Sequence, residues 1–453
     1  MIKIRNSLYL FLIVTLFLAI PSHLFSMQTY NTQKVFPNSH EIWQQLLILS
    51  LDQGLSAPSS SGPFSLTELI QIYERINRTA VSSEQRMRYQ QVGAFLQSES
   101  KQAPVQFSAS LHLTFETYLH SNSKDYKHES DWYYDNELRR PLALFSAEAW
   151  FGSQSYLFTN FGIKNNRFAT EDPDNNVPSD TLLFQNSWST NIIGKGSHDF
   201  DTPSRAFIAF GSDNYSVQLG RDLISWGYGQ SGNLIIDDHS KYHDFLKVSL
   251  FTNTAKFTSL TMFFDPPGYT TKHRHRYVPV LPDDPTLRML LAHRFEWTPL
   301  KNLRLEISEN VMYQDTYCNP SYLNPLFIFH NHSNRSQFNA IADITFALTI
   351  KPNLLLYGTW AIDQVQAPGE GSDQPNAMGY QLGIQQLHQA RTGLWTIKAE
   401  AVYTDAYLYL RDQVDFIIMS RERDQYYGYV PHEEFLGYQY GGDAIVGLCS
   451  LDW

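Results

Sequence analysis

The chain has 453 residues, with 34 basic and 45 acidic side chains and a net charge of −11 at pH 7. This acidic balance argues against nucleic acid as a partner. Only 17% of the residues are charged, whereas 14% are aromatic. Beyond the N-terminal leader, no segment approaches the roughly 18 consecutive apolar residues that a membrane helix needs, so a helical membrane protein is excluded.

Residues 1–26 have the pattern of a secretory signal peptide. Lys3 and Arg5 precede an apolar run from Leu8 to Ile20, which is too short to cross a membrane as a helix. The mature chain is therefore expected to be exported. Export would permit a disulfide between the two cysteines, 318 and 449, but their spacing does not decide whether they pair.

Residues 27–103 predict two or three short amphipathic helices. Helical spacing runs over residues 41–51, and Ser65 with Glu68 forms a capping box before a second apolar face. Ser82 repeats the capping signal before residues 87–96. Residues 56–63, which are rich in serine, are expected to be a linker by composition. In an exported chain these helices should form a small periplasmic domain, placed under or against a barrel mouth.

Residues 105–120 alternate apolar and polar side chains without a break. Only a β-strand places alternate side chains on opposite faces, so one face is apolar and the other carries His112, Glu116 and His120. Soluble strands usually have about 5–6 residues, and a tilted strand needs about 9–11 to cross a bilayer. The segment predicts a long membrane strand, and residues 104–453 an all-β transmembrane antiparallel barrel.

Further alternating segments come in pairs that are joined by short turns, as β-hairpins are. The predicted pairs are 141–151 with 156–164, 205–211 with 214–220, 246–251 with 257–264, 287–297 with 303–313, 338–350 with 354–363, and 380–387 with 394–403; residues 445–453 form a last strand. These segments predict roughly 14–18 strands, joined alternately by short periplasmic turns and long outer loops.

The segment 217–238 combines a strand end with a glycine-rich bend. Flat aromatic rings can stack on the C–H faces of sugars, while carboxylate and guanidinium groups bind hydroxyls. A glycine-rich barrel corner with interfacial aromatics is the alternative, and composition alone favours it. The candidate polysaccharide-binding residues in and directly after this segment are Arg221, Trp226, Tyr228, Asp237, Asp238 and His239.

This segment resembles the Wzi-type capsule assembly family, in which a strand ending Gly-Arg leads to Trp-Gly-x-Gly. Two further segments, 322–325 and 435–444, resemble the family as well. The positions that carry the motif are Gly220, Gly227, Gly229, Gly232, Asn324 and Pro325. The resemblance implies an outer-membrane barrel with a periplasmic helical bundle that binds capsular polysaccharide and holds it at the surface. Family chains usually continue beyond the Gly-Asp-Ala step at 442–444, which leaves barrel closure open here.

One basic cluster, residues 272–276, lies in a predicted long loop. Arg274 and Arg276 could contact an acidic polysaccharide or a lipid phosphate, although a solvated loop is the simpler interpretation. Neither a G-x-S-x-G nor an H-E-x-x-H motif is present, so we expect neither an enzyme nor a metal site.

The sequence thus predicts a non-enzymatic protein that binds or tethers surface polysaccharide. Its expected partners are that polysaccharide and outer-membrane lipids, including lipopolysaccharide-like ones; we expect a monomer without a cofactor. The alternative is a porin or substrate-specific channel. Inward-facing residues should be small and charged in a porin, but bulky and mutually paired in a filled barrel.

Overall fold

The computed structural model describes residues 30–102, 105–119, 140–165, 188–192, 198–200, 205–240, 242–264, 287–317, 322, 324, 337–364, 376–410, 414–424 and 428–453. The predicted signal peptide, residues 1–26, lies outside this part of the chain. Within the described residues, no helix is both long enough and apolar enough to cross a membrane.

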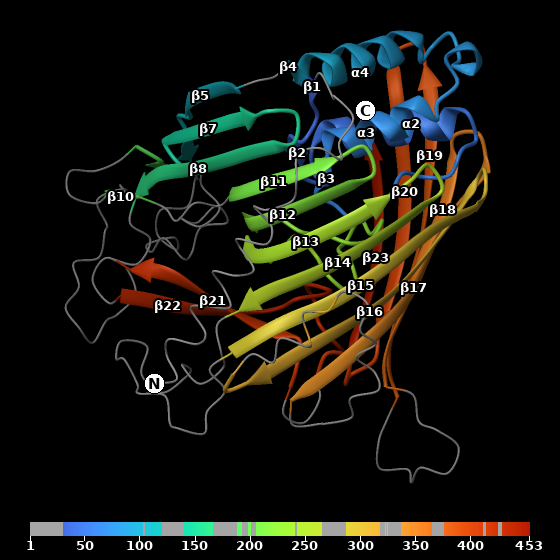
Figure 1. Cartoon of the computed structure of the whole chain (residues 1–453). Helices are drawn as coiled ribbons and strands as arrows, with labels where there is room; N and C mark the ends of the chain where they lie inside the picture. The colour runs from blue at the N-terminus through green and yellow to red at the C-terminus, as the bar shows by residue number, and fades with distance from the viewer. Residues whose placement is uncertain are drawn as a thin grey trace.

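One large antiparallel sheet dominates the molecule and curls around the helices (Figure 1). From one edge to the other its strands are β23 (Ala444–Asp452), β20 (Gly393–Thr404), β19 (Ala377–Ala390), β18 (Leu354–Gln364), β17 (Phe338–Lys351), β16 (Leu303–Asp315), β15 (Leu287–Leu300), β14 (Ala255–Phe264), β13 (His243–Phe251), β12 (Tyr215–Asp222), β11 (Ala206–Ser212), β8 (Ser155–Asn165), β7 (Ala143–Phe151) and β5 (Val105–Leu113). All the predicted hairpins are confirmed. β5 and β23 are its two edges, so the described sheet is not closed.

Alternation along the strands separates an outer apolar face from an inner face. On β12, for example, Leu219 is 51% exposed, whereas the neighbouring Gln218 is buried. Ile344 on β17 and Leu382 on β19 are likewise exposed large apolar side chains. An outward apolar face with polar groups inside is the arrangement of a barrel in lipid.

The predicted sixteen-residue strand at 105–120 is shorter than expected. β5 ends at Leu113, and β6 (Thr117–Leu119) pairs with β9 (Trp188–Thr190) in a separate sheet. Asn191 causes the break, because its side-chain amide donates to the Thr114 carbonyl at 2.7 Å and its side-chain oxygen accepts from the Glu116 N–H at 2.9 Å. These bonds take the place of a regular strand ladder.

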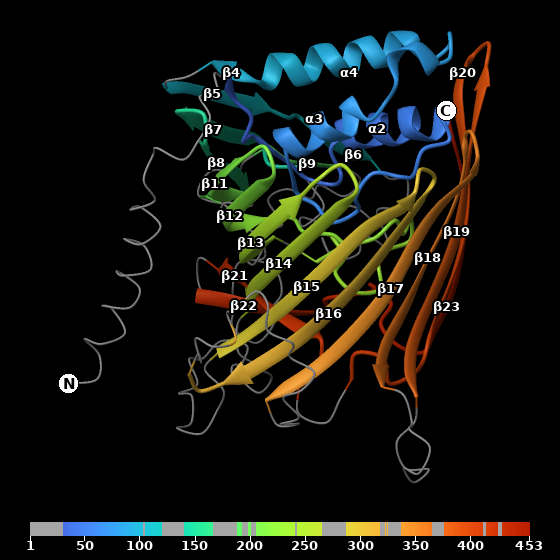
Figure 2. The same ribbon diagram turned by 45° about the vertical axis from the view of Figure 1, so that its right-hand side comes forward.

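Three helices lie at the end of the sheet where the short turns are (Figures 1 and 2). They are α2 (Glu41–Asp52), α3 (Leu66–Glu74) and α4 (Arg86–Glu99). Ser65 caps α3 by accepting from the Glu68 N–H, as predicted. The predicted cap at Ser82 is wrong: Ser82 instead binds the Asp52 carboxylate through its N–H and its hydroxyl, and α4 begins without a side-chain cap.

Several short elements complete the described chain. They are β1 (Tyr30–Asn31), β2 (Val35–Phe36), β3 (Phe64–Ser65), η2 (Arg78–Ala80), β4 (Lys101–Gln102), β10 (His198–Phe200), β21 (Ile417–Asp424) and β22 (Gly428–Phe435). β21 and β22 form a hairpin of their own, and β10 pairs with β8.

Residues 56–63 are not a linker, because they are buried inside the curve of the sheet. Ser59 and Ser60 donate from their hydroxyls to Glu296 and Glu306, each at 2.9 Å. The Ala57 carbonyl accepts from Arg304 at 2.9 Å. Buried carboxylates and guanidinium groups must be paired, and this polar backbone segment supplies part of their hydrogen bonding.

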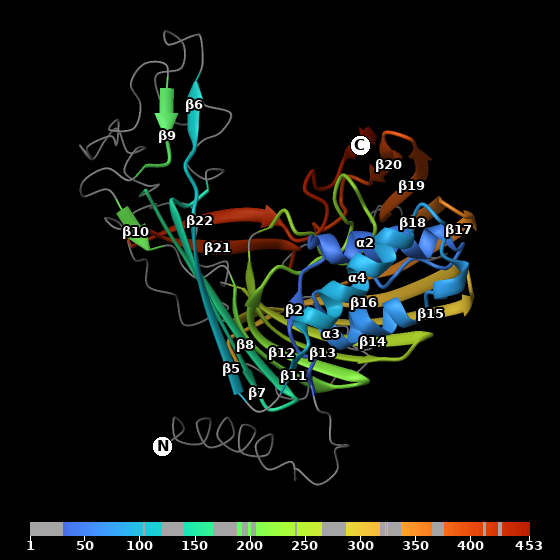
Figure 3. The same cartoon turned by 90° about the horizontal axis from the view of Figure 1, so that it is seen from above.

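The helices and the sheet share one hydrophobic core. Leu46 on α2 and Leu69 on α3 belong to the same buried cluster as Leu355, Tyr357 and Leu387 of the wall. Seen from above, the helices lie within the curve of the sheet (Figure 3). The space inside β13–β20 is therefore occupied by side chains and by the segment 56–63.

Candidate functional site

Most of the segment predicted as a binding site, residues 217–238, lies in the connection between β12 and β13. Residues 223–240 of this connection form the glycine-rich segment, which folds into the curve of the sheet. The Trp226 N–H donates to the Ile236 carbonyl at 3.0 Å, and Trp226 forms a β-bridge with Ser61. Glu400 on β20 accepts from the Ser231 N–H at 2.9 Å. The segment thus joins the buried residues 56–63 to the opposite wall.

Three of the four motif glycines are required by the backbone. Gly220, Gly227 and Gly232 have φ values of 135°, 139° and 126°, a region that residues other than glycine rarely enter. A Cβ on Gly227 would also collide with the Asn233 side chain. Asn233 in turn accepts from the Gly229 N–H at 3.0 Å, which fixes the bend.

Trp226 and Tyr228, predicted to stack on sugars, are both buried. The Tyr228 hydroxyl lies 2.7 Å from the Pro58 carbonyl and 2.9 Å from Glu306, so these two acceptors share its single hydrogen. Burial raises the pKa of this hydroxyl well above the ordinary range. The Arg294 guanidinium lies 5.5 Å from the Trp226 ring centroid, as in a cation–π contact. Neither ring is open to a ligand in this structure, and both hold the segment in place.

Asp237 and His239 form a hydrogen-bonded pair at the end of the segment. His239 Nδ1 lies 2.6 Å from Asp237 Oδ2, while Asp237 Oδ1 accepts from the Asn233 N–H at 2.9 Å. Burial lowers the pKa of His239, but the hydrogen bond and the charge of Asp237 together outweigh it, so the pKa is raised. Asp238 is exposed. These two side chains, His239 and Asp238, are the accessible polar groups of the predicted set on this segment.

Arg221 does not join them. It lies on the outward face of β12, on the same side as Leu219, and pairs with Asp244 of β13 at 3.2 Å. Asp222, the next residue, faces inward and binds Arg205 at 2.7 Å. Strand alternation separates Arg221 from Trp226 and Tyr228, although the three lie within eight residues in sequence.

Most of the remaining predicted residues lie outside the described part of the chain. Arg274, Arg276 and Pro325 lie outside the described residues, as does Cys318, so its pairing with the exposed Cys449 is untested. Asn324 is exposed. Among the residues that the structure describes, no group of three or more His, Cys, Asp or Glu side chains could hold a metal ion.

The segment 435–438 packs on the glycine-rich segment. The Leu436 carbonyl accepts from the Asp237 N–H at 3.1 Å, and the hydroxyls of Tyr438 and Ser231 lie 3.0 Å apart. The two stretches lie about 200 residues apart in sequence and resemble the family independently. Their contact makes them one buried unit inside the sheet.

A second polar group was not predicted as a site. The inner faces of β5 and β7 carry Ser108, Ser110, Ser146 and Glu148, which line a cleft of about 270 Å³ together with residues of the N-terminal segment. The polar alternation of residues 105–120 was the available signal for Ser108 and Ser110. Sequence could not indicate which segment lies opposite them.

Comparison with known proteins identifies a family and finds solved structures with a similar fold. The model of the family described as capsule assembly protein Wzi matches residues 71–453. Wzi of Escherichia coli, described as an outer membrane protein involved in group 1 capsule assembly and a carbohydrate-binding β-barrel, is 14% identical with a TM-score of 0.53. That match covers 92% of this chain and 81% of the other.

A porin and another outer membrane protein are also found. A mutant porin of Rhodopseudomonas blastica is 7% identical over 77% of this chain and 100% of the porin, with a TM-score of 0.29. OmpT of Vibrio cholerae is 11% identical over 66% of this chain and 86% of its own, with a TM-score of 0.26. Both TM-scores are too low to carry an argument. No curated protein matches the chain.

Proposed function

The chain belongs to the family of capsule assembly protein Wzi and is an outer-membrane protein, and from this premise we propose that it binds surface polysaccharide and tethers it to the cell without catalysing a reaction. The observation that carries the proposal is the family match over residues 71–453. A tether binds through several weak contacts at once, so that its overall affinity exceeds that of each contact.

The filled interior supports a tether over a porin. The space inside β13–β20 contains residues 56–63 and 223–240, together with bulky, paired side chains. Arg304 binds Glu296 at 3.1 Å and Lys256 binds Glu68 at 2.5 Å. A porin keeps a water-filled lumen instead, so we expect planar-bilayer recordings to lack the conductance steps of an open porin.

We further propose that the sheet closes into a barrel in the membrane. There the edges β5 and β23 would otherwise leave rows of backbone groups without partners in lipid. The short turns and helices α2–α4 would face the periplasm, as a small domain within residues 27–103, and the long connections would face outward. Residues 104–453 would then supply the barrel.

Within this arrangement the predicted residues take different roles. Asp238 and His239 would contact sugar hydroxyls directly, together with Arg274 and Arg276 of the predicted long loop. Trp226, Tyr228 and Asp237 would act as positioning residues that shape the segment. Arg221, which faces outward beside Asp244, would suit the phosphates of lipopolysaccharide-like lipids.

Retention of polysaccharide by cells tests the function. The full chain would be expressed in a capsule-producing strain that lacks its own Wzi, and cell-bound and released polysaccharide would be measured separately. We expect the wild type to raise the bound fraction and the double variant Asp238→Ala, His239→Ala to lower it. Asn253→Ala, in the exposed turn between β13 and β14, is the control at the other end of the sheet.

Two outcomes would contradict the proposal. If the wild type does not raise the bound fraction although it reaches the outer membrane, the tether function is wrong. If the wild type does but the double variant retains as much polysaccharide as Asn253→Ala, then Asp238 and His239 are not contact residues.

A further inference from the structure

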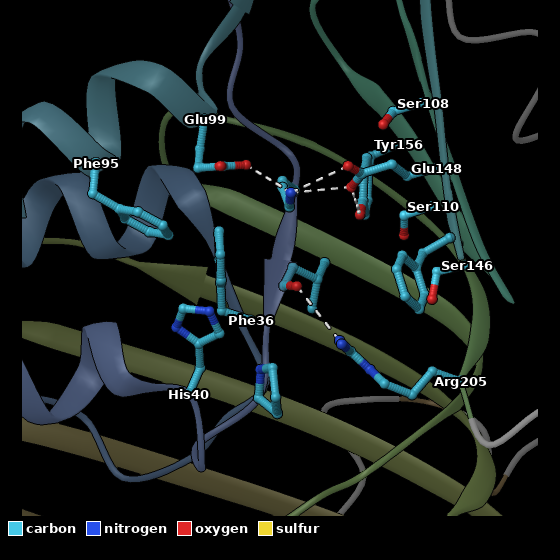
Figure 4. Close-up of a pocket in the computed structure, with 14 residues that line it drawn as sticks. Phe36, His40, Phe95, Glu99, Ser108, Ser110, Ser146, Glu148, Tyr156 and Arg205 are labelled. Atoms are coloured by element: carbon cyan, nitrogen blue, oxygen red, sulfur yellow. Dashed lines mark hydrogen bonds and ion pairs between the residues drawn. The ribbon is translucent and has the colours of Figure 1, made fainter. Parts of the chain in front are cut away.

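The inner faces of β5 and β7 form one wall of the β5–β7 cleft, named here for the strands that carry its serines (Figure 4). Ser110 lies directly opposite Ser146 in the strand register, and Ser108 lies opposite Glu148. Directly opposed residues have Cβ atoms about 4.5–5.5 Å apart. Three hydroxyls and a carboxylate therefore share a small patch, and Ser108 and Ser110 are exposed.

The facing wall is aromatic. Phe36, from the N-terminal segment, is only 3% exposed and packs against His40 and Phe95, with ring centroids 4.9 and 5.9 Å apart. His40 and Phe95 are partly exposed. In Figure 4 these three rings lie on the side opposite the three serines. The partly exposed rings of His40 and Phe95, opposite hydroxyls and a carboxylate, suit a sugar ring, which presents hydroxyls at its edge and C–H groups on its faces.

Glu148 has acceptor capacity to spare. It accepts a hydrogen bond from the Tyr156 hydroxyl at 2.8 Å and forms an ion pair with Lys34 at 3.0 Å. A carboxylate offers about four lone-pair sites, and the Glu148 side chain is 19% exposed. Bidentate acceptance of two ligand hydroxyls is therefore chemically open to it.

The charges of the cleft disfavour an acidic ligand. Lys34 is bound by both Glu99, at 2.6 Å, and Glu148. Arg205 is bound by the fully buried Asp222 through two hydrogen bonds, at 2.7 and 3.1 Å. Both cations are thus neutralised by carboxylates, which outnumber them here, and a uronate would meet repulsion rather than a free cation.

We infer that the β5–β7 cleft is a binding subsite for one uncharged hexose unit of the polysaccharide. The inference rests on the proposed function and deepens it, because it gives the tether a second contact, at the β5 edge of the sheet beside α4 and away from residues 238–239. At about 270 Å³ the cleft is slightly smaller than the roughly 300–1,000 Å³ of sites for drug-sized ligands, which fits one sugar ring rather than several.

Filling the cleft tests the inference, and β5 itself provides the control. Ser110→Phe projects a ring into the cleft, whereas Leu111→Phe, one residue along, projects it to the outer face, where Leu111 is already 61% exposed. The probes are galactose, glucose and glucuronate, observed by saturation-transfer NMR with the full chain in detergent. A difference in gel mobility between unheated and boiled samples would show that each variant is folded.

We expect galactose or glucose to bind the wild type and Leu111→Phe, with affinity at least about tenfold lower for Ser110→Phe. Glucuronate should bind more weakly than the neutral sugars. Should Ser110→Phe not fold, the double variant Ser110→Ala, Ser146→Ala is used, and it should also weaken binding relative to Leu111→Phe.

Equal binding to Ser110→Phe and Leu111→Phe, or stronger binding of glucuronate, would overturn the subsite. The same holds if no neutral sugar binds the wild type. If cells expressing the wild type still retain polysaccharide in those cases, the tether function stands without this subsite. If cells expressing the wild type fail to retain polysaccharide, the tether function itself is wrong.

Discussion

At the scale of single residues, His40 makes the stability of helix α2 depend on pH. Its Nδ1 accepts from the Ile42 N–H at 3.1 Å and so caps α2, which requires an unprotonated Nδ1. Burial, and then the charges of Arg205 and Lys34, lower the pKa of His40 in the folded chain. Glu41 and Glu99 act in the opposite direction but do not outweigh these effects. Protonation therefore costs the folded state a helix cap.

The sign of the pH effect follows from this lowered pKa. Above the unfolded value of about 6.5 the contribution of neutral His40 to stability is complete, and it is lost as the pH falls through the lowered pKa of the folded state. His40→Asn keeps a good cap acceptor but cannot titrate. Between pH 7 and 5, the thermal unfolding midpoint of His40→Asn should fall less than that of the wild type. If the two midpoints fall equally, His40 does not have this role.

At the scale of elements, the strands were predictable and the buried segments were not. Successive strand residues such as Gln218 and Leu219 face the interior and the outer apolar surface in alternation. The sequence therefore alternates polar and apolar residues with a period of two. Residues 56–63 carry no such signal, because the groups that bury them, Glu296 and Glu306, lie more than 200 positions away. Composition therefore indicated a linker where the structure has an interior segment.

The glycine-rich segment shows the same limit. Its bend was predictable from Gly227 and Gly232, which need a backbone that other residues avoid. The burial of Trp226 and Tyr228 was not, because an aromatic side chain looks the same in sequence whether it faces a ligand, Arg294 or Pro58. Only the alternative interpretation, a barrel corner, came close to the structural role of these two rings.

Glu306 contacts both buried segments, and its substitution should lower the free energy of unfolding more than substitution of Tyr228. It accepts from Ser60, Tyr228 and Arg294, and it is fully buried. Glu306→Gln leaves the buried Arg294 without its closest counter-charge, and breaking a buried ion pair costs about 3–5 kcal/mol. Tyr228→Phe removes one hydrogen bond to a charged group, worth about 1.5–3 kcal/mol.

Denaturant unfolding of the detergent-solubilised chain, followed by tryptophan fluorescence, would rank these variants. Asp244→Asn is the matched control, because it also removes a carboxylate that pairs with an arginine, yet its side chain is 58% exposed. Exposed pairs contribute about 0–1 kcal/mol. If Glu306→Gln were as mild as Asp244→Asn, residues 56–63 would not be held in the way described.

At the scale of the whole molecule, a lipid environment requires hydrogen-bond partners for the backbone groups of the two sheet edges. Val105, Phe107 and Leu111 on β5 are 60%, 71% and 61% exposed, and Ile445 and Leu451 on β23 are 84% and 63% exposed. Such apolar outer faces suit lipid, but lipid cannot satisfy the backbone N–H and C=O groups along an edge. An outer-membrane sheet with these edges therefore has to pair them.

Hydrogen exchange in lipid nanodiscs would test that closure. On β5, the amides that point to β7 are bonded in the described sheet, whereas the alternate amides point to the edge. In a closed barrel both sets should exchange slowly, at the rate of a central strand such as β17, with the exposed turn 252–254 as the fast reference. Rapid exchange of every second β5 amide would mean that the edge stays open, and β5 would then have to lie outside the hydrocarbon core.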